Sequence, residues 1–301
     1  MRLRILILAL TTVWLCGCSR AKNLSQAAAT PTPAGATTAP DTAVGAVAGG
    51  YRGFDRNDYP GDSTMAGLHL TFAFTGYWLT NPPGENANSW TGKRALLRQQ
   101  GWGFLVLANG RLDAEILKSQ KQHVSPTQLA RTDADAAVAA ARSEGFPAHA
   151  ILFLDQEEGG LLLAEQSAYL LAWTEAVSSS DYRAGVYASG QPVPNGPGQA
   201  VTTIQDIRSH VKSGQLHEIA IFDAQDTCPP APGCTLRAKP LVSAGESDLT
   251  AWQYSQSPRR PELTKSCAAT YAADGNCYAP GFPTTFLDMD FASGPDPSHG
   301  R

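Results

Sequence analysis

The chain has 301 residues, of which 43% are hydrophobic, so it can bury the core of one large domain or of two small ones. Its formal net charge is −4 at pH 7, and this becomes −6 when Arg2 and Arg4 of the predicted leader are removed. An acidic chain offers no basic surface for nucleic acid, so a nucleic-acid partner is not expected.

The N-terminal segment has the features of an export signal. Arg2 and Arg4 precede the apolar run ILILALTTVWL, which is too short to span a membrane as a helix. The following Leu15-Cys16-Gly17-Cys18 resembles a bacterial lipobox, whose final cysteine becomes the lipidated first residue of the mature protein. We predict a lipoprotein signal peptide over residues 1–17, lipidation at Cys18 and attachment to a membrane of the bacterial cell envelope. A plain cleaved signal is the alternative.

Residues 18–50 differ in composition from the rest of the chain. They are rich in Ala, Thr, Pro and Gly and poor in large apolar residues, so they cannot form a packed core. We predict a flexible tether, which at random-coil scaling would hold the domain on the order of 30 Å from the membrane. The predicted barrel domain then covers residues 51–295, and a disordered tail covers 296–301.

The pattern from residue 51 onward predicts an α/β fold. Eight apolar runs of strand type cover residues 51–55, 68–79, 103–110, 150–157, 183–189, 218–225, 249–255 and 285–292. Helical patterns lie between the earlier runs, at residues 89–100, 127–144, 161–178 and 199–213. Strands that alternate with helices indicate a parallel sheet, and eight of them indicate a closed TIM-like barrel. The last three strands are joined by loops, which makes the architecture (β/α)5(β)3.

Acidic residues stand at the ends of three predicted strands. Asp155 and Glu157 end an apolar strand and point to the same face, because side chains alternate along a strand. Asp55 ends the first strand, and Asp288 and Asp290 share a face of the last. Active sites of such barrels lie at the C-terminal ends of the strands, so these acids are expected to converge on one cleft. Like charges held close give carboxyl groups with different proton affinities.

Six residues are candidates for substrate binding. Alternation along the second strand places Tyr77 toward the barrel interior, and aromatic faces suit sugar rings, although such residues also simply fill barrels. The candidates are Tyr77, Tyr187, Trp252, Gln253, Tyr254 and Asp290.

Four cysteines remain once Cys16 and Cys18 are assigned to the leader and the lipid. An even number in an exported protein favours disulfides. Each of the segments CPPAPGC and CAATYAADGNC encloses a short turn, so of three connectivities the sequence favours Cys228 with Cys234 and Cys267 with Cys277. A zinc site is the weaker alternative, because no histidine has ligand spacing near them.

Five motifs carry a family resemblance. GFDRND, LDQE, GVYAS, AWQYS and LDMDFA occur in the order found in the family 25 glycoside hydrolases, the cell-wall muramidases. The stretch AARSEGFPAHAILFLDQE resembles more closely the signature of the related glycoside hydrolase-like domain, first catalogued as domain of unknown function 1906. The resemblance covers residues 51–292. It implies a barrel of five β/α units followed by three strands.

The same resemblance implies roles for the acids. Glu157 falls on the general acid of the muramidases, and Asp155, Asp55 and Asp288 fall on their other active-site carboxylates. Asp290 stands where many muramidases have Asn. Independently of the family, glycoside hydrolysis needs one carboxylic acid as proton donor and a second carboxylate as nucleophile, base or charge stabiliser.

The sequence therefore supports three functions. The leading prediction is a lipid-anchored glycoside hydrolase, muramidase-like and without cofactor, acting on peptidoglycan or another envelope polysaccharide. The alternative is a barrel that binds glycans in envelope assembly without turnover. A third possibility is a hydrolase that uses the acids to hold Mg²⁺ or Ca²⁺, since hard cations prefer oxygen ligands. The sequence gives no indication of the oligomeric state.

Overall fold

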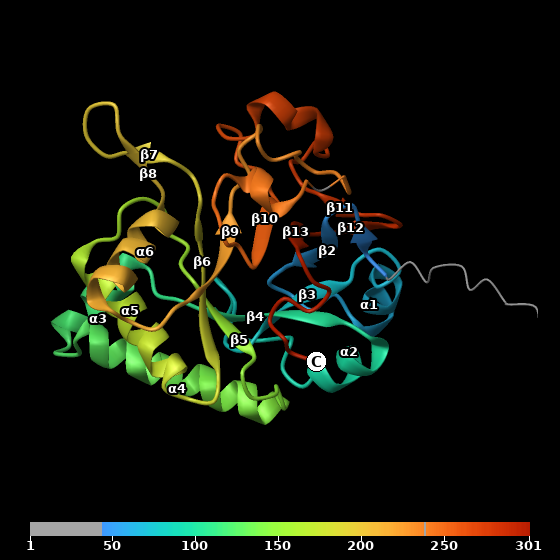
Figure 1. Cartoon of the computed structure of the whole chain (residues 1–301). Helices are drawn as coiled ribbons and strands as arrows, with labels where there is room; N and C mark the ends of the chain where they lie inside the picture. The colour runs from blue at the N-terminus through green and yellow to red at the C-terminus, as the bar shows by residue number, and fades with distance from the viewer. Residues whose placement is uncertain (1–43, 238) are drawn as a thin grey trace, which may run out of the picture. The chain divides into compact units, whose positions relative to one another are not determined.

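The computed structural model describes residues 44–237 and 239–301, which are coloured by residue number in Figure 1. The predicted signal peptide, the lipidation site at Cys18 and most of the predicted tether lie outside the described residues. Within the described part of the chain, none of the helices has the length and apolar character needed to cross a membrane.

Eight strands close into a barrel. They are β2 (Gly50–Asp55), β3 (Phe74–Trp78), β4 (Gly103–Asn109), β5 (Ile151–Asp155), β6 (Arg183–Ser189), β9 (Ala220–Ala224), β10 (Ala251–Ser255) and β13 (Asp288–Ala292). Each pairs with the next in this order, and β13 pairs with β2 to complete the ring. The predicted TIM-like barrel is confirmed. Seven strands are parallel, but β13 runs antiparallel to both of its neighbours, which the expectation of a parallel sheet did not include.

Helices cover only part of the barrel. The helices α1 (Asp62–Leu68), α2 (Arg94–Gln100), α3 (Asp113–Lys121), α4 (Pro126–Glu144), α5 (Ala164–Ser178) and α6 (Thr203–Gly214) lie between strands β2 and β9 in the chain. Beyond β9, the described residues form no α-helix: besides β10 and β13 they form the 3-10 turns η1 (Leu241–Ala244) and η2 (Lys265–Thr270) and the hairpin β11 (Tyr278–Ala279) with β12 (Phe282–Phe286). A second small hairpin, β7 (Val193–Pro194) with β8 (Ala200–Val201), follows β6. In Figure 1 the loops after β9 and β10, in orange and red, stand without a helical layer. The predicted (β/α)5(β)3 order is confirmed.

The longest helix shows how local sequence sets these boundaries. Ser125 begins α4 with a capping box, because its Oγ accepts from Gln128 N at 3.2 Å while Gln128 Oε1 accepts from Ser125 N at 3.0 Å. Gly145 ends the helix at a φ of 79°, which only glycine adopts without strain. Small residues bury the face toward α5: Ala130, Ala134, Ala137, Val138 and Ala141. They let the two helices pack closely.

The second predicted strand is only half correct. Residues up to Leu68 belong to α1, and the strand begins at Phe74. Side-chain direction is also reversed: a Cβ on Gly53 would lie 2.1 Å from the ring of Phe74, so the glycine makes room for that ring inside the barrel. Tyr77 therefore points outward, where its hydroxyl donates to Glu144 Oε2 at 2.6 Å. The rule that large residues face outward fails where a glycine stands opposite.

The chain ends of the domain differ from the predicted boundaries. Ala46 and Val47, expected in the tether, form the short strand β1 (Ala46–Val47) beside β2. Ser298, expected in a disordered tail, is fully buried. Its Oγ accepts from Val106 N at 2.9 Å and its carbonyl accepts from Ile151 N at 2.8 Å, so the tail satisfies backbone groups of β4 and β5.

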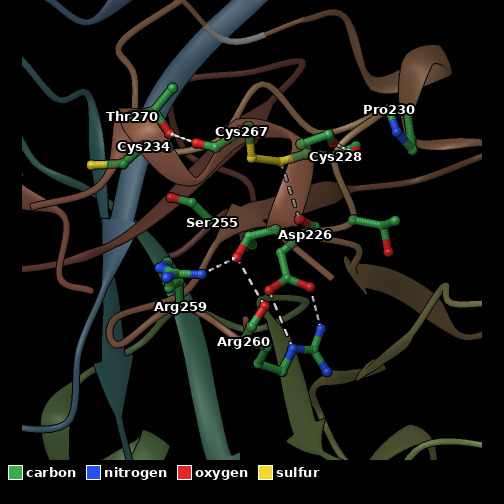
Figure 2. Close-up of a disulfide and its surroundings, with 12 residues drawn as sticks. Asp226, Cys228, Pro230, Cys234, Ser255, Arg259, Arg260, Cys267 and Thr270 are labelled. Atoms are coloured by element: carbon green, nitrogen blue, oxygen red, sulfur yellow. Dashed lines mark hydrogen bonds and ion pairs between the residues drawn. A yellow bond between two sulfur atoms is a disulfide. The ribbon is translucent and has the colours of Figure 1, made fainter. Parts of the chain in front are cut away.

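The predicted disulfide pairing is wrong. A disulfide joins Cys228 to Cys267, with 5.8 Å between their Cα atoms (Figure 2). The reason is that the loop after β10 folds back over the loop after β9, where Cys228 N donates to Leu263 O at 3.1 Å. Among the described residues, the two other cysteines, Cys234 and Cys277, are free thiols, and Cys277 Sγ contacts Ser255 Oγ at 3.5 Å.

Candidate active site

One solvent-open pocket lies at the C-terminal ends of the parallel strands, where barrel enzymes carry their sites. Its empty space, including the open solvent at its mouth, is about 380 Å³. Its lining consists of Asp55, Asn57, Trp78, Leu107, Asp155, Glu157, Tyr187, Phe222, Gln253, Gln256 and Asp288. The structure thus brings together all four carboxyl groups that the sequence marked as catalytic candidates, together with Tyr187 and Gln253. The pocket combines acids with aromatic walls, as sugar-binding clefts do.

Asp155 and Glu157 occupy different depths of this pocket. Asp155 ends β5 and is only 5% exposed, whereas Glu157 stands two residues further on and is exposed to solvent. Burial raises the pKa of Asp155 well above its ordinary value, and the nearby charge of Glu157 adds to the rise. Partial loss of solvent in the cleft also raises the pKa of Glu157, although the neighbouring Asp155 opposes that rise. Each carboxyl group therefore affects the proton affinity of the other.

Asp55 is held at the pocket floor by a chain of hydrogen bonds. Its Oδ2 accepts from Gln253 Nε2 at 2.8 Å, and Gln253 Oε1 accepts from Tyr187 Oη at 2.8 Å and from Gln256 Nε2 at 2.9 Å. Burial raises the pKa of Asp55 to about 6, with the donor from Gln253 working in the opposite direction. Asp55 is therefore largely ionised at neutral pH.

The direction of β13 decides which of its two acids reaches the pocket. Because the strand is antiparallel, its first residue, Asp288, pairs with Asp55 at the mouth, while Asp290 pairs with Gly53 one layer deeper. Asp288 accepts from Ser257 N at 2.6 Å, and burial raises its pKa well above the ordinary value. Asp290 is fully buried and does not line the pocket, so its predicted contact with substrate is not supported.

Three aromatic candidates point away from the pocket. Tyr77 faces the helix layer, as described above. Trp252 and Tyr254 are fully buried on the outer side of β10, where they donate to Gln225 O at 2.7 Å and to Thr235 O at 3.0 Å. Since side chains alternate along a strand, Gln253 can face the interior only if its two neighbours do not. The prediction that these three aromatic residues bind substrate is therefore wrong.

Several pocket residues were missed by sequence reasoning. Trp78 is the last residue of β3 and donates from Nε1 to Arg56 O at 3.1 Å. Its position at a strand end is the same signal that marked Asp155, but the reversed alternation of β3 hid it. Asn57 and Gln256 follow strands β2 and β10 in loops, where no periodic pattern exists to indicate their direction.

An ion pair stands beside the pocket on the helix-free side. The Arg260 guanidinium binds the carboxylate of Asp226 through Nε, at 3.2 Å, and through its second nitrogen. Asp226 is buried, whereas about a third of the Arg260 side chain is exposed. Figure 2 shows this pair next to the Cys228–Cys267 disulfide, which connects the two loops that carry it. The charge of Arg260 lowers the pKa of Glu157.

A metal centre is not formed by the described residues. Over 44–237 and 239–301, no three His, Cys, Asp or Glu side chains are arranged to hold an ion. The cysteines predicted as a weaker zinc alternative include two that form the disulfide.

The family model of the Rv2525c-like, glycoside hydrolase-like domain matches residues 73–229, more than half of the chain. The chain belongs to this family. The matched range contains Asp155 and Glu157, while Asp55 and Asp288 lie on either side of it. The resemblance to the glycoside hydrolase-like domain seen in the sequence is confirmed. The sequence matches no curated protein significantly.

Solved structures with a similar backbone fold have low sequence identity to this chain. An uncharacterized B. stearothermophilus protein has 18% identity and a TM-score of 0.49, over 80% of this chain and 95% of that one. The Tat-secreted protein Rv2525c of Mycobacterium tuberculosis, in complex with L-tartrate, has 11% identity and a TM-score of 0.48, over 81% and 95%. The modular autolysin LytC of Streptococcus pneumoniae, in complex with a synthetic peptidoglycan ligand, has 10% identity and a TM-score of 0.43, over 80% and 46%.

Proposed function

We propose that this protein is an exported, lipid-anchored glycoside hydrolase that cleaves O-glycosyl bonds in peptidoglycan or another polysaccharide of the cell envelope. The observation that carries the proposal is the convergence of Asp55, Asp155, Glu157 and Asp288 on one solvent-open pocket. Membership of a glycoside hydrolase-like family supports the same reaction class.

Glu157 is the proposed general acid. It is the most exposed of the four carboxyl groups, so it can reach the oxygen of the leaving sugar. Asp155 lies behind it, in hydrogen-bond contact, and its raised pKa makes it a store for the proton that the pair shares. Glu157 donates this proton to the leaving group as the glycosidic bond breaks.

Asp55 is the proposed ionised partner. Positive charge develops on the sugar ring in the transition state, and a fixed carboxylate stabilises it. The amide of Gln253 holds Asp55 in place and favours its ionised form. Trp78, Tyr187 and Phe222 supply the aromatic walls against which the sugar ring would lie.

The decisive experiment is incubation of the purified full chain with peptidoglycan and with other envelope polysaccharides. Release of new reducing ends is expected. If none appear on any glycan, the hydrolase proposal fails.

A non-catalytic glycan-binding barrel is the second candidate. Burial raises the pKa of Glu157, but the contact with Asp155 and the charge of Arg260 oppose this rise, and an ionised Glu157 could not serve as the proton donor. In this case the chain would bind glycans with unchanged affinity in wild type and in Glu157→Gln, and no reducing ends would be released.

The lipid anchor is proposed from the sequence at Cys18. Replacing Cys18 by Ala should move the protein from the membrane fraction to the soluble fraction while its thermal unfolding stays unchanged. A variant that stays with the membranes would contradict lipid attachment.

A further inference from the structure

Asp290 is a buried acid that the proposed reaction does not use. It is fully buried inside the barrel, on a strand position between Gln253 of β10 and Gly53 of β2. Among the described side chains, none donates a hydrogen bond to either of its carboxyl oxygens. An ionised carboxylate in this place would have lost its water without gaining a donor or a cation, which is strongly unfavourable.

The charged groups around Asp290 make ionisation still less favourable. Asp55 on β2 and Asp288 on the same strand are its nearest titratable neighbours, and both are acids. Gln253 on β10 is neutral and directs its amide to Asp55. Tyr254, also on β10, points to the opposite face of that strand, and Arg52 on β2 does the same because it precedes Gly53.

Asp55 is the neighbour placed to accept a hydrogen bond from a protonated Asp290. Asp55 pairs with Asp288 and Gly53 pairs with Asp290, so Asp55 and Asp290 face the barrel interior diagonally across two neighbouring strands. Asp290 lowers the pKa of Asp55, while the charge of Asp55 adds to the rise that burial causes in the pKa of Asp290, as expected of two neighbouring carboxyl groups that can share one proton. Asp55 has a second donor in Gln253, whereas Asp290 has none, so the proton belongs on Asp290.

We propose that Asp290 is a positioning residue, a carboxylic acid kept protonated inside the barrel, whose O–H donates to the Asp55 carboxylate and fixes its position. Two donors, the carboxyl O–H of Asp290 on β13 and the side-chain amide of Gln253 on β10, then hold Asp55 ionised and correctly placed at the pocket floor. Only the catalytic role of Asp55 rests on the proposed function; the protonation of Asp290 does not.

The first test compares the stability of wild type and Asp290→Asn from pH 4 to pH 8. Burial raises the pKa of Asp290, so the stability that its neutral form contributes is fully present below the unfolded pKa of about 4 and is lost as the pH rises. The Asn side chain cannot titrate. The unfolding equilibrium constant of wild type, relative to that of the variant, should rise by up to tenfold per pH unit above about pH 4. Parallel curves would show that Asp290 is ionised and would overturn the proposal.

The second test measures the pKa of Asp55 from the carboxyl carbon resonance in wild type, Asp290→Asn and Asp290→Leu. The Asn amide can donate to Asp55 as the protonated acid does, but Leu cannot. The pKa of Asp55 should therefore remain near about 6 in the Asn variant and rise in the Leu variant. An equal pKa in all three proteins would overturn the positioning role. Should the Leu variant not fold, Asp290→Ala takes its place.

These readouts need no substrate, so they separate this inference from the proposed function. If the protein hydrolyses no glycan, the titrations still decide the state of Asp290. If the protein is an enzyme, the acidic limb of its pH–rate profile should move upward in Asp290→Leu and stay in place in Asp290→Asn.

Discussion

The barrel has two sides that position their site residues in different ways. From β2 to β6, each strand is followed by a helix, and the site residues Asp55, Trp78, Asp155 and Tyr187 lie at or next to the ends of strands. From β9 to β13, no α-helix covers the strands in the described part of the chain, and the loops after β9 and β10 are joined by a disulfide and by an ion pair beside the pocket. The comparison indicates that strand ends supply the chemistry, while the loops of the helix-free side adjust it.

The strongest test of this contrast is to remove the proposed proton donor, Glu157, on the helix-covered side of the barrel. Glu157→Gln keeps the size and polarity of the side chain but cannot donate the proton, so turnover should fall by about two to four orders of magnitude. Reducing-end release under saturating substrate measures it.

Glu218→Gln is the matched control for this substitution. Glu218 is exposed and lies just before β9, at the opposite end of the barrel from the pocket. The turnover of the Glu218→Gln variant should equal that of wild type. An equal loss in both variants would mean that the assay reports protein quality rather than catalysis.

The disulfide tests how much the helix-free side depends on covalent support. Cys228 and Cys267 are 39 residues apart, and in the chain-entropy model the closure of such a loop stabilises the fold by about 4 kcal/mol. The double variant Cys228→Ser/Cys267→Ser should lose stability of this order in denaturant unfolding. Reduction of wild type should give a loss of similar size. Peptide mapping without reduction that linked Cys228 to Cys234 would contradict the pairing.

The same contrast explains what the sequence could predict. Periodic patterns indicated the strands and helices from β4 to β6, and the acids Asp155 and Glu157 followed from a single apolar strand that ends in charges. The orientation of β3 was mispredicted because the reason lies on another strand, in the missing side chain of Gly53. Sequence patterns alone do not reveal such a pairing.

On the helix-free side, the errors have a different physical origin. The antiparallel direction of β13, the crossing of the loops that joins Cys228 to Cys267, and the ion pair of Arg260 all depend on long-range packing. Local hydrophobic periodicity does not indicate these long-range contacts. The order of the strands was predictable there, and so were Asp288 and Gln253, but Phe222 and Gln256, which also line the pocket, were not.

A buried acid outside the pocket gives the next largest expected effect. Asp223 lies on β9 with its side chain on the outer face, since its neighbour Phe222 lines the pocket. It is fully buried without a hydrogen-bond donor from any described side chain, and burial raises its pKa to about 8, with the charge of Glu246 adding to the rise. The stability that its neutral form contributes is fully present below about pH 4 and is lost as the pH rises through about 8.

Replacement of this acid should therefore change stability increasingly as the pH rises from about 4 to about 8. Asp223→Asn should match wild type in unfolding free energy near pH 3.5 and exceed it by a few kcal/mol at pH 9. Thermal or urea unfolding at several pH values measures the difference. A constant difference across this range would show that Asp223 does not titrate in the way its burial implies.

The smallest expected effect tests whether the loops adjust the chemistry of the strand ends. The Arg260 charge lowers the pKa of Glu157, but its side chain is partly exposed, so solvent and salt screen the interaction. Arg260→Gln should raise the pKa of Glu157 by less than about one unit. The alkaline limb of the pH–rate profile should move upward by the same amount, and high salt should move wild type in the same direction.

Because the single variant leaves Asp226 buried without its partner, the double variant Asp226→Asn/Arg260→Gln separates the charge effect from lost stability. Arg259→Gln is the matched control, since Arg259 contacts Thr264 and not the pocket. If Glu157 titrates identically in wild type, Arg260→Gln and Arg259→Gln, the helix-free side only supports the pocket and does not adjust its acid.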